Sequence, residues 1–314
     1  MPRLPFFRRH AEERGGERAA GTHRSCYRNR SGIALINKAI AAREILLLRA
    51  FEEAREAALK SGIEIIPLKG AALLELGVYQ FGERGMSDVD ILLRPKDLPA
   101  FEEILEGLGY QPMPGSSDAW LKPSPNNAPP AILDLHTGLW HIRNTEELFN
   151  QGLESGPVGL VLNPADLFLH AAAHPLLHHG EVTPRALEDC ARIALRASGD
   201  GAKFWAAVAR KAEIYNLRPV IWPVLSRLSL LSGLNLDNFR PRGVEKIKAA
   251  FFEKAAQKHS IPLEYLLPVL HRPWLLIKYA VPEKRFMLRR YGSASAAVYM
   301  LRPLRLLYSI LRKK

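Results

Sequence analysis

The chain has 314 residues, of which 47% are hydrophobic and 24% charged, so it can bury a sizeable core and is expected to form two domains. No apolar run reaches the roughly 18 residues that a membrane span needs. Its two cysteines, Cys26 and Cys190, lie far apart without a C-x-x-C motif, which favours a reducing cytoplasm over a disulfide framework. The Arg-rich start lacks the apolar core of a secretory signal, so export is not expected.

The net charge of +12 is concentrated at the two ends of the chain. Residues 1–32 hold eight Arg and three Glu (+5), and residues 284–314 hold nine Lys or Arg and no acid (+9), which leaves −2 for the middle. A basic end can bind RNA, DNA or anionic lipid through its charge alone, although solvated termini are often basic too. Residues 1–32 show little apolar periodicity and are predicted to be a disordered basic tail.

The first expected elements are a helix, a strand and a second helix. Residues 33–60 place apolar side chains at helical spacing and predict a helix that packs on a sheet. Residues 62–68 read as a short strand, and residues 69–76 as the helix that follows it. Backbone N–H groups and the positive end of a helix dipole are exposed at such a junction, so the backbone of Gly70 and the charge of Lys69 are expected to bind an anion.

The next strand carries the most informative pattern, RGMSDVDILL at residues 84–93. Side chains at i and i+2 leave a strand by the same face, so Asp88 and Asp90 should stand together while the apolar residues that alternate with them enter the core. Two such carboxylates repel each other unless a cation lies between them. Mg²⁺ suits this spacing, because it takes one or two carboxylates plus substrate phosphates. For the tripeptide alone, a solvated Asp-x-Asp strand or turn is the more common interpretation, and the flanking residues favour the metal site.

A third strand completes the expected α/β (α+β) core with its small mixed sheet. Residues 97–108 predict a helix, and the proline-rich residues 110–130 predict a loop or irregular hairpin. Residues 131–136 follow as an apolar strand with Asp134 in its middle, and His136 lies on the same face.

The second half of the chain is predicted to be mainly helical. Asn163-Pro164 and Thr183-Pro184 pair an N-cap with a first-turn proline and should open two helices. A last helix is expected to enter through Pro303 and to pack on the helical domain, with membrane-surface binding as the lesser alternative. The expected domains are therefore a core over 33–150 and a helical domain with a basic C-terminal helix over 151–314. The expected helices span 164–179, 184–198, 203–215, 217–232, 243–257 and 302–312.

The helix after Pro164 carries His170, His174 and His178 at i, i+4 and i+8, with His179 beside them. On a regular helix these imidazoles could hold Zn²⁺ together with a carboxylate such as Asp189, although Pro175 can kink the helix and spoil the alignment. The favoured alternative is a hydrogen-bonded wall of histidines between the helical domain and the active cleft.

Three motifs together make the chain resemble a known superfamily. They are Leu68-Lys69-Gly70, Arg84-x-x-Ser87-Asp88-x-Asp90 and Leu133-Asp134-Leu135-His136, with Gly109-Tyr110 following a helix between the last two. Their order resembles the DNA-polymerase-beta-like nucleotidyltransferases, and most closely the family known as uncharacterised nucleotidyltransferase. The resemblance covers residues 63–179 well. Most members of the wider superfamily carry Gly-Ser where this chain has Lys69-Gly70.

The resemblance implies transfer of a nucleoside monophosphate from an NTP to an acceptor hydroxyl, with Mg²⁺ as the cofactor and Mn²⁺ as the alternative ion. Asp88, Asp90 and Asp134 would be the catalytic and metal-binding carboxylates. His136 would contact these carboxylates without binding the metal itself. The expected nucleotide-binding residues are Lys69, Gly70, Arg84 and Ser87. Arg84 would contact phosphate or fix Asp90; a plain ion pair that neutralises the carboxylate cluster is the alternative.

The acceptor stays open among an RNA 3′ end, a protein hydroxyl, a sugar and another small molecule. Two other classes of function are kept beside the enzyme. One is a nucleotidyltransferase fold that has lost activity and serves as a binding module, against which the three intact carboxylates argue. The other is an RNA or membrane-surface adaptor that acts through the basic termini.

Overall fold

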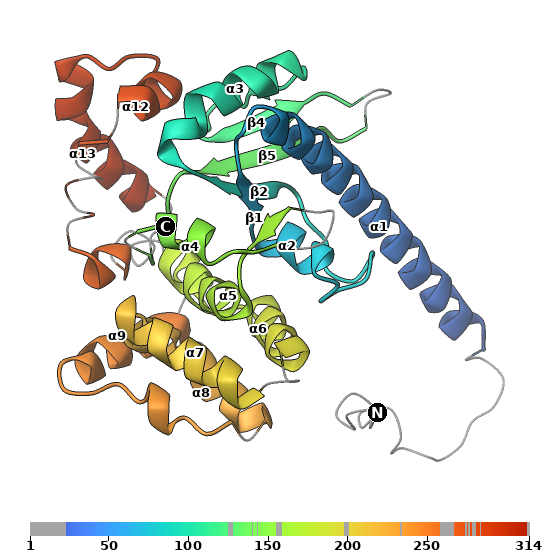
Figure 1. Ribbon diagram of the computed structural model, residues 1–314, viewed down its shortest axis with the longest axis vertical. Helices are drawn as coiled ribbons and strands as arrows, with labels where there is room; N and C mark the ends of the chain where they lie inside the picture. The colour runs from blue at the N-terminus through green and yellow to red at the C-terminus, as the bar shows by residue number, and fades with distance from the viewer. Residues whose placement is uncertain are drawn as a thin grey trace.

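A computed structural model gives the fold (Figure 1). It describes residues 23–124, 128–139, 141–142, 144–154, 159–197, 201–232, 234–257, 267–273, 275, 277, 281–282 and 284–312, with side chains from 37 to 304 except 153–154 and 231–232. The elements of the first half are α1 (His23–Lys60), β1 (Ile65–Pro67), α2 (Lys69–Glu75), β2 (Val89–Leu93), the 3-10 turn η2 (Pro95–Asp97), α3 (Leu98–Gly107), β3 (Gln111–Pro112), β4 (Ala119–Lys122), β5 (Ala131–His136) and α4 (Glu146–Asn150).

The centre of the molecule is a mixed five-stranded sheet with the strand order β1-β2-β5-β4-β3. β2 and β5 run parallel, with Asp90 opposite Asp134, whereas the remaining neighbours are antiparallel. The proline-rich segment contributes the hairpin β3–β4 to one edge of the sheet. The expected α/β core with a small mixed sheet is therefore confirmed.

Alternation along β2 directs its side chains into two separate cores. Val89, Ile91 and Leu93 pack on one face with apolar residues of α1 and α3. Leu92 enters the apolar cluster on the opposite face, which the helical half of the chain covers. Asp90 lies two residues from Leu92, so its carboxylate belongs to the face that α5 approaches.

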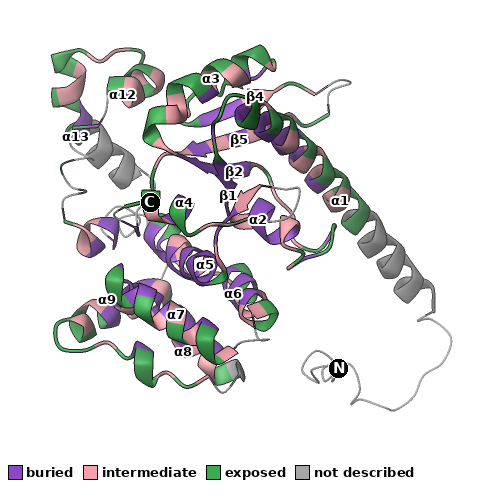
Figure 2. Ribbon diagram, viewed as in Figure 1, coloured by how far each residue is buried: buried purple, intermediate pink, exposed green. Residues whose placement is uncertain are grey.

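The helical half packs around α5, which is largely buried (Figure 2). The side chains of Asn163 and Thr183 accept from the backbone N–H of Asp166 and Ala186, so both predicted N-caps are confirmed. The remaining elements are the two-stranded sheet β6 (Leu153–Glu154) and β7 (Leu160–Val161), α5 (Pro164–His179), α6 (Pro184–Arg196), α7 (Gly201–Ile214), α8 (Arg218–Ser232), the 3-10 turn η6 (Asp237–Phe239), α9 (Glu245–Gln257), α12 (Lys284–Tyr291) and α13 (Ala296–Arg312).

The N-terminal helix is longer than expected. α1 begins at His23, so residues 23–32, which were predicted to be disordered, are helical. Arg is a good helix former, and a segment without an apolar face of its own can extend a helix that is already packed further along. Residues 1–22 lie outside the described residues.

The C-terminal helices differ from the prediction in two ways: the last helix begins earlier in the chain, and a further helix precedes it. α13 begins at Ala296 and contains Pro303 in its interior, so Pro303 does not open the helix. α12, which was not predicted, packs on the core: Arg285 and Arg289 pair with Glu102 of α3. The α13 residue Arg302 lies over the ring of Phe286 on α12. Leu304 of α13 is exposed, so it does not make the packing on the helical domain that was predicted for this helix, and the side chains after residue 304 lie outside the described residues.

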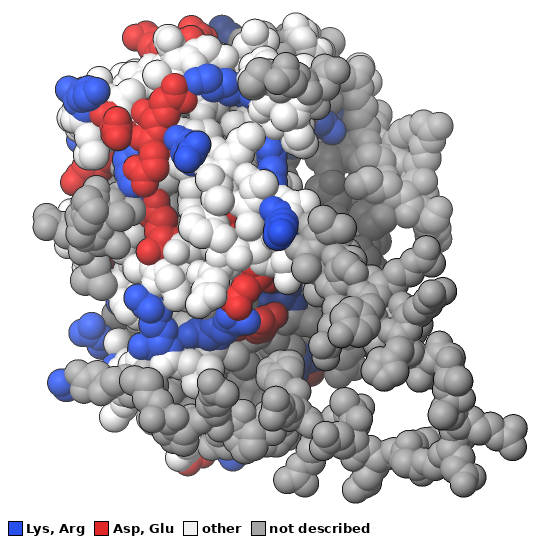
Figure 3. Space-filling model, turned by 90° about the vertical axis from the view of Figure 1, so that its right-hand side faces the viewer, with Lys and Arg blue, Asp and Glu red and all other residues white. Residues whose placement is uncertain are grey.

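One face of the described surface carries charged side chains of both signs. Figure 3 shows Lys and Arg lying among Asp and Glu on the face that it draws. Some of the basic C-terminal charge is used within the protein, because Arg289 also donates to the carbonyl of Ser117 and lies over Trp120. Among the helices of the described residues, none has both the length and the apolar character needed to cross a bilayer.

Candidate active site

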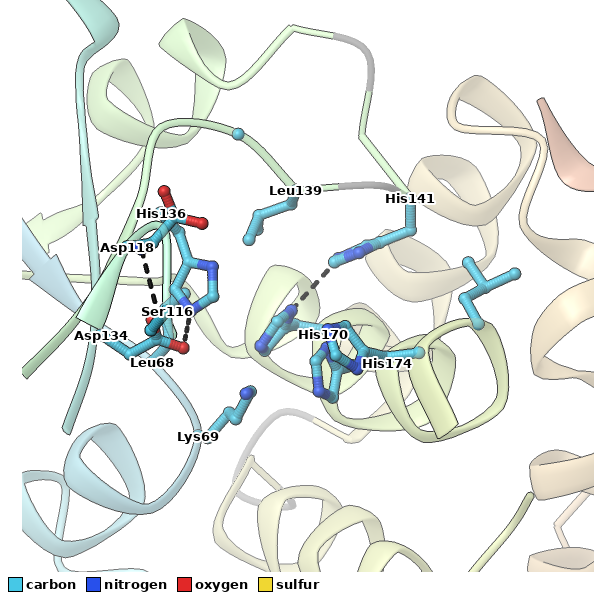
Figure 4. A pocket seen from close by; sticks show the side chains of 13 residues that line it. Leu68, Lys69, Ser116, Asp118, Asp134, His136, Leu139, His141, His170 and His174 are labelled. Carbon is cyan, nitrogen blue, oxygen red and sulfur yellow. Dashed lines mark hydrogen bonds and ion pairs between the residues drawn. The ribbon is translucent and has the colours of Figure 1, made fainter. Parts of the chain in front are cut away.

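A pocket of about 230 Å³ lies between the sheet and α5. Figure 4 shows the imidazoles of His170 and His174 across this pocket from Asp134 and His136. The polar residues that line it come from the start of α2 (Lys69), the β3–β4 hairpin (Ser116, Asp118), β5 and the segment after it (Asp134, His136, His141), and α5 (His170, His174, His178).

The parallel pairing of β2 and β5 sets Asp90 beside Asp134. Asp90 is buried, and its Oδ1 lies 2.5 Å from Lys69 Nζ and 2.9 Å from His136 Nε2. The same imidazole nitrogen lies 3.5 Å from Asp134 Oδ2. Asp90, Asp134 and His136 each offer a ligand atom within 4.8 Å of the others, so the structure brings together three of the predicted site residues in a group that could hold a metal ion.

The surroundings shift the pKa values of Asp90 and Asp134 in opposite directions. Burial alone would raise the pKa of Asp90, but the hydrogen bond with His136 and the charge of Lys69 outweigh it and hold that pKa well below its usual range. Burial raises the pKa of Asp134, against the opposing charge of His136. The pKa of His136 is raised, because its contacts with Asp90 and Asp134 outweigh the effect of burial. Asp90 is thus the fixed anion of the pair, and Asp134 is the group that more readily accepts a proton.

The Lys69-Gly70 junction is shaped by close packing. Lys69 has a φ of +47°, a left-handed conformation that costs a residue with a Cβ about 1–2 kcal/mol. A Cβ on Gly70 would lie 2.6 Å from Arg84 Nη1 and 2.8 Å from Met86 Sδ, so the position has no room for a side chain without rearrangement. The N–H of Leu68 donates to the carbonyl of Asp90 at 2.9 Å and fixes the junction against β2. These contacts place the Lys69 ammonium beside the Asp90 carboxylate.

Asp88 is partly exposed and lies just before β2. The hydroxyl of Ser87 donates to its carboxylate at 3.0 Å, and Arg43 donates to the Ser87 carbonyl at 2.6 Å. Within the part of the chain that the structure describes, Asp88 is not in the group formed by Asp90, Asp134 and His136. The sequence pattern placed Asp88 on the same face as Asp90, but it did not reveal that Asp134 and His136, rather than Asp88, form the group with Asp90.

Arg84 does not contact the carboxylate cluster as the sequence suggested. Its Nη2 and Nε donate to Asp189 of α6 at 2.8 and 3.1 Å, and the hydroxyl of Tyr79 donates to the same carboxylate. Neither predicted contact of Arg84 with Asp90 is present, because the side chain turns toward α6. The same contacts occupy Asp189, which is therefore not a partner of the α5 histidines as the zinc hypothesis supposed.

Glu44 of α1 is a buried carboxylate that the sequence patterns did not single out. It is 0% exposed and accepts from the backbone N–H groups of Gly82 and Gly85 at 2.6 and 2.8 Å. A Cβ on Gly82 would lie 2.7 Å from the carbonyl oxygen of Asn37, so the loop presses directly on α1. The only signal in the sequence is an acidic residue on the buried side of an amphipathic helix. Glu44 fixes the loop that leads into the Asp88–Asp90 segment.

Replacing Glu44 by Gln tests that role. Hydrogen bonds to a charged group contribute about 1.5–3 kcal/mol, and one of the two N–H groups would face the amide donor instead of an oxygen. We expect Glu44→Gln to lower the free energy of unfolding, measured by chemical denaturation, by about 1–3 kcal/mol. The exposed Glu56 on the same helix provides the control, since Glu56→Gln should change it by less than about 0.5 kcal/mol. Equal effects at both positions would contradict the role assigned to Glu44.

His170, His174 and His178 of α5 form one wall of the pocket. The wall is not fully hydrogen-bonded as the sequence suggested, because Nε2 of His170 and of His174 is buried and has no hydrogen-bond partner among the described residues. His170 Nδ1 lies 3.4 Å from Nε2 of His141, which approaches from the segment after β5. Burial lowers the pKa of His170 to about 3 and that of His178 to about 4, and it lowers the pKa of His141 and His174 well below the usual value. The wall is therefore neutral near pH 7 and offers imidazole nitrogens rather than positive charge.

Comparison with known proteins gives one family. The family model described as "Uncharacterised nucleotidyltransferase" matches residues 28–233. Among solved structures, the antibiotic-resistance factor ANT(2'')-Ia, studied in solution for its substrate-regulated conformation dynamics, is similar at 14% identity with a TM-score of 0.40. The similarity covers 55% of this chain and 95% of that one. No curated protein matches the chain.

Proposed function

Because this chain belongs to the family of uncharacterised nucleotidyltransferases, we propose that it moves a nucleoside monophosphate from an NTP to a hydroxyl of an acceptor in a Mg²⁺-dependent reaction. The observation that supports this most is the pairing of Asp90 with Asp134 on adjacent parallel strands, beside a pocket that Asp134 and Lys69 line. Two carboxylates and a lysine at one site match the needs of a reaction on a metal-bound triphosphate.

The residues at the site fit a hard divalent ion. Asp90 and Asp134 supply carboxylate oxygens, the ligand type that Mg²⁺ and Mn²⁺ prefer. Asp88, which is partly exposed and lies outside this group, is assigned to the ion together with the bound nucleotide. Lys69 and His136 now supply the positive charge around Asp90. A bound divalent ion would supply the charge that stabilises the triphosphate and the attacking oxygen during transfer.

Asp134 is the residue that we assign to the acceptor's proton. The acceptor oxygen forms a bond to the α-phosphorus while the bond from that phosphorus to the bridging oxygen breaks, and pyrophosphate leaves with the electron pair. The acceptor proton passes to Asp134, the carboxylate of the pair that lines the pocket. His136, in contact with both carboxylates, holds them in position.

The nucleotide phosphates are assigned to the segment around Lys69. Lys69 can exchange its contact with Asp90 for one with phosphate, the backbone of Gly70 lies next to it, and Ser87 offers a hydroxyl at the start of β2. Arg84 is assigned a positioning role: its pair with Asp189 holds the side chain against Gly70.

The test uses each NTP labelled at the α-phosphate, with Mg²⁺ or Mn²⁺ and a fractionated cell extract. We expect one NTP to label one fraction, and the labelled fraction then identifies the acceptor as RNA, protein, sugar or another small molecule. We also expect that NTP, with Mg²⁺, to raise the melting temperature of the protein. Binding of NTP without transfer to any fraction would favour an inactive binding module. Binding of RNA or anionic vesicles that falls steeply with salt, without any NTP effect, would favour an adaptor.

A further inference from the structure

We propose that His174, His178 and His179, at the C-terminal end of α5, form a second metal site that takes a transition-metal ion such as Zn²⁺. One ligand nitrogen from each of the three imidazoles lies within 4.8 Å of the other two. Its ligands are different residues from those of the carboxylate group of Asp90 and Asp134, and the proposal does not depend on the function proposed above.

The arrangement of the three rings follows from the helix. His174 and His178 are one turn apart, so their side chains lie on one face, and their ring centroids are 4.8 Å apart. His179 is the last residue of α5, and its ring centroid lies 5.3 Å from that of His174 and 4.7 Å from that of His178. Three imidazoles that converge in this way are the ligand set of a zinc site that keeps one coordination position open.

The histidine group in the structure differs from the set of zinc ligands that the sequence suggested. His170 is not in the group, because its Nδ1 faces His141 instead. Asp189 is held by Arg84 and Tyr79, so the ligand set contains no carboxylate. Pro175 lies inside the helix, yet α5 continues through it to His179.

The chemical state of the ring nitrogens supports metal binding. Nε2 of His174 is buried and makes no hydrogen bond to any residue that the structure describes. Imidazole suits Zn²⁺ and Co²⁺, whereas Mg²⁺ takes oxygen ligands, so the two groups should select different ions.

His174 and His178 also line the pocket that contains Asp134. An ion held by them is therefore reached from the same space as the carboxylate group, and its open position can take an oxygen or nitrogen of a molecule in the pocket. The proposal thus assigns to the α5 wall the capacity to bind a ligand through a metal.

The experiment is a Co²⁺ titration of the full chain, followed by the visible absorption of the bound ion and by competition with Zn²⁺. We expect one Co²⁺ per chain with the spectrum of a nitrogen-bound ion, displaced by Zn²⁺ and unaffected by excess Mg²⁺. Mutating a residue that only hydrogen-bonds to a metal ligand lowers metal affinity by about 10- to 100-fold. The double variant His178→Gln, His179→Gln removes two ligands, so it should bind Co²⁺ at least about tenfold more weakly than the wild type. Both residues are exposed, so this variant should keep the wild-type thermal unfolding curve.

Two controls separate this site from the rest of the protein. His23→Gln replaces the first residue of α1, which is not one of the three proposed ligands, and should bind Co²⁺ like the wild type. Asp134→Asn should also retain Co²⁺, although it should lower the rate of nucleotidyl transfer by at least about 100-fold. Loss of the Co²⁺ signal in Asp134→Asn but not in the histidine double variant would overturn the proposal, and so would an unchanged affinity in that double variant.

Discussion

Asp90→Asn and Asp134→Asn are each expected to lower the rate of nucleotidyl transfer by at least about 100-fold, measured as labelled product per minute at saturating NTP. This is the scale on which a single lost group that stabilises developing charge affects turnover. The two variants should differ in binding. Asp90→Asn removes the carboxylate next to Lys69 and should abolish the stabilisation by Mg-NTP, whereas Asp134→Asn should retain much of it.

Stability without metal should also distinguish the two variants, because the carboxyl groups have opposite pKa shifts. The lowered pKa of Asp90 means that its ionised form stabilises the fold above its usual pKa, a contribution lost as the pH falls through the lowered value. At neutral pH, Asp90→Asn should therefore lower the free energy of unfolding by about 1–3 kcal/mol. The raised pKa of Asp134 means that its ionised form is disfavoured in the fold, so Asp134→Asn should leave stability unchanged or slightly raised. Full transfer activity in either variant would contradict the roles assigned here.

Lys211→Met should give the largest loss of stability among single changes away from the candidate site. Lys211 Nζ on α7 lies 2.7 Å from Asp166 Oδ2 on α5, and both side chains are buried. Removing one partner of a buried ion pair costs about 3–5 kcal/mol, since the other charge stays buried and uncompensated. We expect a decrease of that size in the free energy of unfolding, measured by urea denaturation.

The matching control is Lys203→Met, which removes an exposed lysine of the same helix and should have little effect. If the unpaired carboxylate is the cause, Lys211→Met should cost clearly less when it is made in an Asp166→Asn background. An equal cost in both backgrounds would point to lost packing of the lysine stem instead.

Local sequence patterns were sufficient for the strands and helix starts that surround the site. The strand at 131–136, the helix that begins at Lys69 and the caps at Asn163 and Thr183 depend on neighbouring residues, and each lies where it was predicted. Only the family resemblance indicated that Asp90 lies near Asp134. Local patterns could not, because this proximity depends on strand pairing between distant segments.

The contacts that patterns could not predict join residues far apart in the chain. Arg84 finds Asp189 more than a hundred positions later, and Glu44 accepts from a loop about 40 residues away. Side-chain type restricts the partners of Arg84 to acids, but only the packing of α6 against the loop decides which acid it meets. For the same reason, the Asp-x-Asp spacing could not show that Asp134, rather than Asp88, forms a group with Asp90 and His136.

One apolar cluster contains residues from both halves of the chain, and this has a consequence for how the enzyme can be divided. Ile66, Leu73 and Leu92 from the sheet half pack in the same cluster as Phe168 of α5 and Val224 of α8. A fragment that ends at residue 150 would therefore expose one whole face of the sheet to water, and it would be prone to aggregate. The expected boundary at 150 separates regions of different secondary structure, but the two regions should melt in a single cooperative transition and should be expressed together.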